Sequence, residues 1–132
     1  DNVAHIAHAG DSRAYLVNKD GVEQITVDHS LVQNLVDRGE ITKEEAEHHP
    51  NKNVITRALG VDKRIDVDFS EIDMQENETL VLCTDGLSNC VNNSEMAEDI
   101  KDGQYYAFAD RLVKRANKNG GNDNITVVAI AI

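Results

Sequence analysis

Residues 79–86 have the sequence TLVLCTDG, an unbroken apolar run that stops abruptly at Asp85-Gly86. A run of this length without polar alternation predicts a strand that is buried on both faces. The Asp-Gly pair predicts a tight turn directly after it. We therefore expect residues 79–84 to form a central strand, with a carboxylate at its end.

Other strand patterns lie on both sides of this run. Five stretches have the composition of strands: residues 3–9, 14–17, 22–27, 65–73 and 125–132. Asp20-Gly21 predicts a hairpin turn between the second and third of them. Strict alternation in residues 65–73 predicts that Ile65, Val67 and Phe69 face the core. Residues 53–59 have strand or turn character.

Helix signals interrupt the strands. Ser30 with Gln33, and Thr42 with Glu45, predict the starts of two short helices, the second ending before Pro50. Ser94 predicts the N-cap of a third helix, and the apolar stripe of residues 105–117 predicts a fourth. Strands and helices follow one another without regular βαβ alternation. The predicted fold class is therefore α+β, with largely antiparallel sheets.

Composition limits the kinds of function. The chain has 132 residues, 24 acidic and 13 basic, with a formal net charge of −11. This charge argues against a nucleic-acid partner or membrane insertion, and no apolar run has the length of a membrane span. It suits a divalent cation, although an acidic, soluble surface explains it more simply. Cys83 and Cys90 imply no disulfide framework, so we expect a reducing, cytoplasmic setting.

Three aspartates occur where predicted strands begin or end, each beside glycine or in a turn. These are Asp11, Asp85 and Asp123. Strand ends gather at one rim of a sheet, so the three carboxylates could converge and hold Mg²⁺ or Mn²⁺. Alternatively, each is only a turn residue that bonds its own backbone. Spacing alone leaves both interpretations open.

The other chemistry-bearing residues give no comparable signal. We interpret His5 and His8 as structural, because residues three apart lie on opposite faces of a strand. His29 lies at a predicted helix start and His48-His49 at a predicted helix end, where a cation favours the dipole. No zinc-type spacing of Cys or His occurs. Cys83 lies in the apolar run, which favours an inert core thiol over a nucleophile.

The order of five motifs resembles that of the protein phosphatase 2C family, the metal-dependent serine/threonine phosphatases, and is most similar to the bacterial type. The motifs are residues 9–16 (AGDSRAYL), 28–30 (DHS), 53–60 (NVITRALG), 83–87 (CTDGL) and 120–126 (GGNDNIT). The resemblance implies a β-sandwich flanked by helices. It also implies that residues 1–132 are the C-terminal portion of a single catalytic domain, with a helical flap insertion at about 29–53.

The resemblance assigns roles to individual positions. It implies that Asp85 and Asp123 are ligands of two core metals, Mn²⁺ or Mg²⁺. It further implies that Asp11, with Asp85, holds a third, more weakly bound metal. Arg13 and Arg57 match motif positions that we interpret as structural ion-pair partners. The family's Asp-Gly-x-Gly-Gly motif, which supplies a bridging metal ligand, does not occur in this sequence. The chain also begins at Asp1 without Met, which suggests part of a longer protein.

The implied function is hydrolysis of phosphoserine and phosphothreonine in proteins by a metal-activated water. The partners would be phosphorylated proteins, substrates of a serine/threonine kinase. Two alternatives remain: a non-catalytic regulatory or binding module that resembles a phosphatase, and a simple divalent-cation sensor. Without the missing motif we expect the isolated chain to be inactive. We also expect it to dimerise or swap strands, because half a sandwich exposes strand edges.

Overall fold

The central strand of the sequence lies inside a four-stranded sheet. The computed structural model describes residues 2–101 and 105–132. In it, β5 (Thr79–Cys83) pairs with β2 (Arg13–Asn18) on one side and with β6 (Val127–Ala131) on the other. The hairpin partner of β2 is β3 (Gly21–Gln24), so the strand order is β3-β2-β5-β6, with every pair antiparallel. The predicted hairpin and central strand are confirmed.

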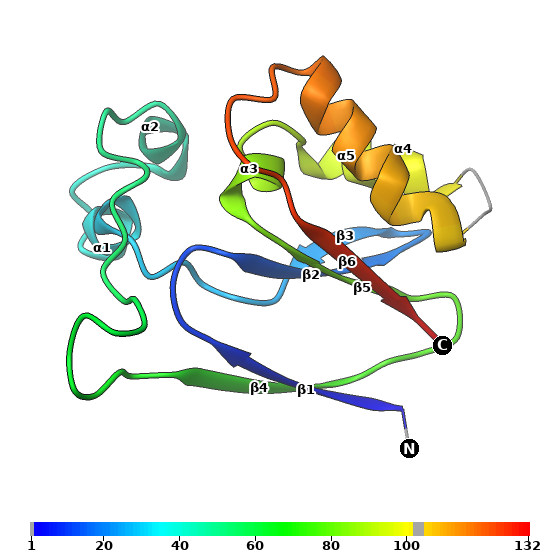
Figure 1. The fold of residues 1–132 in the computed structure, drawn as a ribbon, viewed down its shortest axis with the longest axis horizontal. Coiled ribbons are helices and arrows are strands. Elements are labelled where there is room, and N and C mark those ends of the chain that lie inside the picture. Colours follow the sequence, from blue (N-terminus) through cyan, green and yellow to red (C-terminus); the bar gives the residue numbers. More distant parts are fainter. Residues whose placement is uncertain (1, 102–104) are drawn as a thin grey trace.

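A second, smaller sheet faces the first (Figure 1). It consists of β1 (Val3–His8) and β4 (Asp68–Asp73), which pair in antiparallel register from Val3–Asp73 to His8–Asp68. The two sheets and the helices outside them confirm the predicted class, a helix-flanked antiparallel α+β fold.

Both faces of β5 are covered, which explains its unbroken apolar sequence. On one face, Val81 and Cys83 belong to a core that includes Phe108 and Leu112. Two helices contribute most of the helical side of this core, α4 (Asn93–Lys101) and α5 (Phe108–Lys118), the latter preceded by a 3₁₀ turn, η1 (Tyr105–Ala107). On the other face, Leu80 packs with residues of the second sheet.

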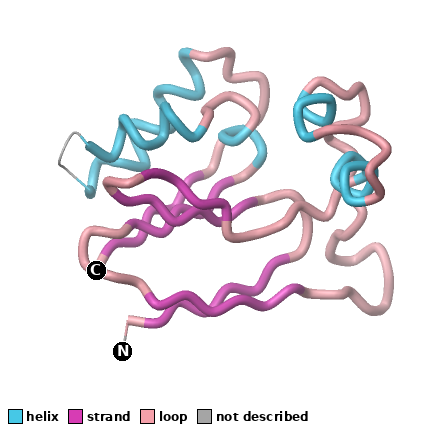
Figure 2. Tube along the Cα trace, turned by 180° about the vertical axis from the view of Figure 1, so that it is seen from behind, coloured by secondary structure: helices cyan, strands magenta, loops and turns pink. Residues whose placement is uncertain are grey.

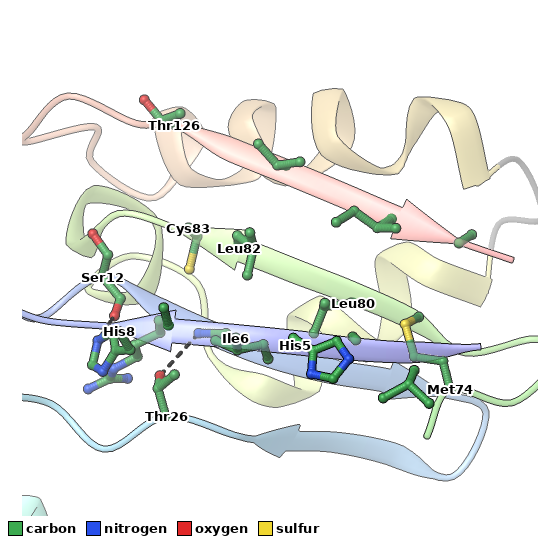
Figure 3. Close-up of a pocket in the computed structure, with 18 of the residues that line it drawn as sticks. His5, Ile6, His8, Ser12, Thr26, Met74, Leu80, Leu82, Cys83 and Thr126 are labelled. Atoms are coloured by element: carbon green, nitrogen blue, oxygen red, sulfur yellow. Dashed lines mark hydrogen bonds between the residues drawn. The ribbon is translucent and has the colours of Figure 1, made fainter. Parts of the chain in front are cut away.

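The two-stranded sheet covers only part of the four-stranded one. A cavity of about 800 Å³ lies between them (Figure 3). Its walls are largely apolar, and they include Ile6 of β1 and Leu82 of β5. Opposite Leu82 and Leu80 on β6, Val128 and Ile130 are 48% and 44% exposed. In the described part of the chain, this face of the large sheet is therefore incompletely covered.

A helical insertion leaves the sheets at their far end, away from α4 and α5 (Figures 1 and 2). It contains α1 (Leu31–Asp37), whose N-cap Ser30 accepts a hydrogen bond from the Gln33 amide, and α2 (Lys43–Glu47). Both sides of the predicted Thr42–Glu45 capping box are present. Among the described helices, none combines the length and apolar character needed to cross a bilayer.

Three expectations about local structure are wrong. Phe69 is 79% exposed, because Ile72 and not Phe69 packs with Ala4 and Ile6. The N-cap of α4 is not Ser94: Asn92 and Glu95 exchange the reciprocal bonds of a capping box.

Residues 53–59, for which the sequence leaves strand and turn open, form turns and a single bridge between Ile55 and Ser30. The third wrong expectation concerns Asp85-Gly86. The chain does not simply turn at Asp85-Gly86, because these residues begin a short helix, α3 (Asp85–Ser88).

Candidate functional site

The structure brings two of the three aspartates together. In the pairing of β2 with β5, Arg13 lies opposite Cys83. Asp11 lies two residues before Arg13 and Asp85 two residues after Cys83, so both lie beyond the same end of the sheet. Burial, and then the negative charge of the Asp85 carboxylate, raise the pKa of Asp11 above its usual value. The two carboxylates therefore lie close enough to repel each other.

The loop that carries Asp123 lies against α3. A Cβ atom built on Gly86 would stand 2.0 Å from the carbonyl oxygen of Asn124, so only glycine allows this approach. The Thr84 hydroxyl accepts a hydrogen bond from the Thr126 amide at 3.0 Å, which fixes the loop to the end of β5. Asp123 itself accepts a bond from the amide of Asn124 at 2.7 Å.

Asp123 thus lies in the loop beside Asp85, but its carboxylate bonds locally. Within residues 2–101 and 105–132, its ligand atoms do not join those of Asp11 and Asp85 in a metal-sized group. In this structure Asp123 behaves as a turn residue, because its carboxylate bonds its neighbouring backbone amide. Asp11 and Asp85 instead lie close together at one end of the sheet, as a shared metal site would require.

The donor set at Asp11 and Asp85 fits a hard divalent cation. Two carboxylates in contact repel each other unless one takes up a proton or a cation lies between them. The raised pKa of Asp11 expresses this repulsion together with burial. Both residues supply oxygen atoms only, the ligand type that Mg²⁺ and Mn²⁺ prefer.

The two motif arginines are ion-pair partners, as expected. Arg13 forms a bidentate pair with Asp28, at 2.8 and 2.7 Å, and also donates to the Tyr15 hydroxyl at 2.9 Å. Arg57 donates to Asp68 at 3.0 Å. None of these hydrogen bonds joins Arg13 or Arg57 to Asp11 or Asp85.

One constellation at this end of the fold was missed by the sequence interpretation. His8, His29 and Asp68 place ligand-type atoms within 4.8 Å of one another. His29 is 6% exposed and its ring nitrogen Nε2 lies 2.6 Å from Asp68 Oδ2. These residues are 21 and 39 positions apart in sequence, so no local pattern links them. In the sequence, the only feature that pointed to His29 as a functional residue was its place in the motif at residues 28–30.

The cysteine predictions are consistent with the structure. Cys83 is buried and Cys90 partly buried, and both are free thiols. Burial raises the pKa of Cys83 to about 11. A thiol with this pKa is protonated at neutral pH and is a poor nucleophile.

Comparison with known proteins gives close relatives, although no family model matches the chain. A serine/threonine phosphatase, stp, of Listeria innocua is 47% identical over 126 residues, covering 95% of this chain and 50% of that protein. The solved structure of the S. agalactiae serine/threonine phosphatase superposes with a TM-score of 0.95 at 35% identity, covering 100% of this chain and 55% of that one.

A third similar protein has been solved with bound metal. The catalytic domain of the serine/threonine protein phosphatase PstP, solved in complex with two manganese ions, matches with a TM-score of 0.85 at 36% identity. It covers 98% of this chain and 53% of that one. The chain thus spans about half the length of the relatives that it matches.

Proposed function

The chain belongs to the protein phosphatase 2C family of serine/threonine phosphatases, and we propose on that basis that it forms part of an enzyme that hydrolyses phosphoserine and phosphothreonine in proteins. We propose that this hydrolysis depends on Mn²⁺ or Mg²⁺. Bound divalent cations would supply an activated water and would neutralise charge on the phosphoryl group.

The observation that carries this proposal is the proximity of Asp11 and Asp85 beyond one end of the large sheet. Two mutually repelling carboxylates in a half-buried loop destabilise the fold unless a proton or a bound cation relieves the repulsion. Asp11, Asp85 and Asp123 are the residues that we propose as ligands. Asp123 would have to exchange its local bond to the Asn124 amide for a bond to the cation.

Activity would also need groups from outside the 132 residues. The chain lacks the Asp-Gly-x-Gly-Gly motif of the family and covers about half of its relatives. We therefore propose that these 132 residues correspond to the C-terminal part of the catalytic domain and are inactive by themselves. In the whole enzyme, the helical insertion at about 29–53 would form a flap beside the site.

The substrate side follows from the same family membership. Phosphorylated proteins, the products of a serine/threonine kinase, would be the partners. The free cysteines are consistent with a reducing compartment such as the cytoplasm.

The test is hydrolysis of a phosphothreonine peptide by the full-length protein. We expect activity to disappear with a chelator and to return with added Mn²⁺. Asp85→Asn should lower kcat by roughly a hundredfold or more, because one charge that stabilises the transition state is lost.

Glu71→Gln is the matched control. Glu71 is an exposed carboxylate of β4 that pairs with His5, and its loss should leave hydrolysis unchanged. Metal-independent hydrolysis, or equal activity in Asp85→Asn, would contradict the proposal. Metal binding without hydrolysis would favour the alternative of a non-catalytic module.

A further inference from the structure

Apart from the neighbouring carboxylates of Asp11 and Asp85, the strongest feature is the way that His29 binds Gly10, the residue before Asp11. The Gly10 amide donates to His29 Nδ1 at 3.0 Å. The His29 amide in turn donates to the Gly10 carbonyl at 2.8 Å. Both main-chain groups of Gly10 are thus bound by one residue, and that residue is buried.

These bonds fix the protonation of the His29 ring. A backbone amide can only donate, so Nδ1 must be the unprotonated acceptor. The proton therefore resides on Nε2, which lies 2.6 Å from Asp68 Oδ2 and donates to it. A carboxylate on the far side of an imidazole sets both its tautomer and its orientation.

Asp68 is itself held by Arg57, in the loop that follows the helical insertion. Arg57 donates to Asp68 Oδ1 at 3.0 Å and to the Asp66 carbonyl at 3.3 Å. The carbonyl oxygen of Arg57 also lies 3.7 Å from the position of a Cβ on Gly10. The bonds to His29 and then Arg57 lower the pKa of Asp68, so it is ionised at neutral pH.

We propose that His29 and Asp68 are a positioning pair, which holds the Gly10 peptide and thereby keeps the Asp11 carboxylate against Asp85. The pair touches neither substrate nor metal; it acts through the backbone of Gly10. As far as it concerns metal binding, this inference rests on the proposed function.

A metal site at His8, His29 and Asp68 is the competing interpretation, and the geometry disfavours it. Two ligands of one tetrahedral ion, each at roughly 2.0 Å, would lie about 3.2 Å apart. The His29–Asp68 separation of 2.6 Å is instead that of a hydrogen bond.

The remaining ligand positions are also largely occupied. His29 uses both ring nitrogens and Asp68 both oxygens. Only His8 Nδ1 lacks a partner among the described residues, since His8 Nε2 lies 2.6 Å from the Ser12 carbonyl.

The experiment compares Asp68→Ala and Asp68→Asn with the parent, in the full-length protein. Asp68 is half-exposed, so its removal leaves the core intact. Asn retains an oxygen that can accept the bond from His29, and should rescue part of the loss caused by Ala. Glu71→Ala is the matched control, because it removes another carboxylate of β4 that pairs with a histidine of β1.

Two measurements report on the pair. Without metal, amide exchange by NMR should show Gly10 exchanging about tenfold faster in Asp68→Ala than in the parent, while amides of β5 stay unchanged. With metal, the Mn²⁺ concentration for half-maximal hydrolysis should rise about tenfold, the low end of effects seen when a supporting partner is removed. At saturating Mn²⁺, kcat should return to near the parent value.

If Asp68→Ala destabilises the fold, His29→Asn provides the second variant. Its side-chain oxygen can accept the Gly10 bond but cannot reach Asp68. The proposal expects a Gly10 exchange rate between those of the parent and of His29→Ala.

Unchanged Gly10 exchange and an unchanged Mn²⁺ requirement in Asp68→Ala would overturn the proposal. So would uniform acceleration of all amides, which would indicate a merely structural bond. Micromolar Zn²⁺ binding that is lost in both His8→Ala and Asp68→Ala would also overturn it, in favour of a metal site. If neither the parent nor any variant hydrolyses the phosphopeptide, the proposed function is wrong. The metal-free measurement of Gly10 exchange still decides whether His29 and Asp68 position Gly10.

Discussion

At the scale of single residues, close approach and buried charge determine the site. Gly86 lies so near the Asn124 carbonyl that no side chain fits. Asp11 and Asp85 meet because the β2–β5 register brings their loops to the same end. Arg13 and Asp28 form a bidentate, partly buried pair beside them. At this end of the sheet, substitution of Gly86 by a larger residue, or of Arg13 or Asp28 by an uncharged one, would therefore disturb the structure.

Gly86→Ala tests the close approach. The new methyl group would overlap the Asn124 carbonyl, so α3 and the Asp123 loop must move apart. We expect the free energy of unfolding to fall by about 3 kcal/mol, the upper end of overpacking costs, as measured by urea denaturation.

Gly39→Ala serves as the comparison. No atom lies within 4 Å of a Cβ at Gly39, but its φ of +73° strains any other residue. Its cost should be about 1 kcal/mol, from backbone strain alone. A loss for Gly86→Ala no larger than that for Gly39→Ala would contradict a steric overlap with the Asn124 carbonyl.

At the scale of elements, helices differ in what stabilises them. The α5 helix buries Phe108, Leu112 and Ala116 against the large sheet. The α2 helix buries no residue at all, and its Thr42–Glu45 capping box is its main local support. The helical insertion should therefore open more easily than the rest of the fold.

Thr42→Ala tests this difference. Loss of the cap should weaken α2 by about 1 kcal/mol, which corresponds to roughly fivefold faster amide exchange at Ala46. The midpoint of global thermal unfolding should stay constant, because α2 contributes nothing to either core.

Glu44→Ala is the control, since it changes the same helical turn and leaves the Thr42–Glu45 pair intact. A drop in global stability for Thr42→Ala alone would mean that the insertion folds cooperatively with the sheets.

At the scale of the whole molecule, the described residues form an incomplete sandwich. A two-stranded sheet faces a four-stranded one, and a largely apolar cavity of about 800 Å³ separates them. Because relatives are about twice as long, we infer that their additional residues fill this space and pair with the free strand edges.

Association experiments test this inference. By itself, the 132-residue chain should self-associate and bind a hydrophobic dye, as measured by light scattering and fluorescence. Co-expression with the remaining half of a relative's domain should give a one-to-one complex without dye binding. Val128→Glu, which places a charge on the half-exposed face of β6, should prevent that complex. A monomer that binds no dye would contradict the inference.

Sequence by itself determined the features that local physics controls. The strand at residues 79–84, the hairpin at Asp20-Gly21 and the cap at Thr42 follow from periodicity and from bonds between near neighbours. Ser94 was the wrong cap because a competing pair, Asn92 and Glu95, offered the same bonds two residues earlier. Asp11 and Asp85 could be named as candidates because turn residues at strand ends are visible in sequence.

Tertiary structure alone decided which of these groups meet. The exposure of Phe69 depends on Ile72 packing against β1, which alternation within β4 does not encode. The bonds of His29 to Gly10 and to Asp68 depend on chain segments 19 and 39 residues away. Hydrogen bonds between such distant residues form only after the sheets have set their register, so the support beneath Asp11 could be found only in the folded molecule.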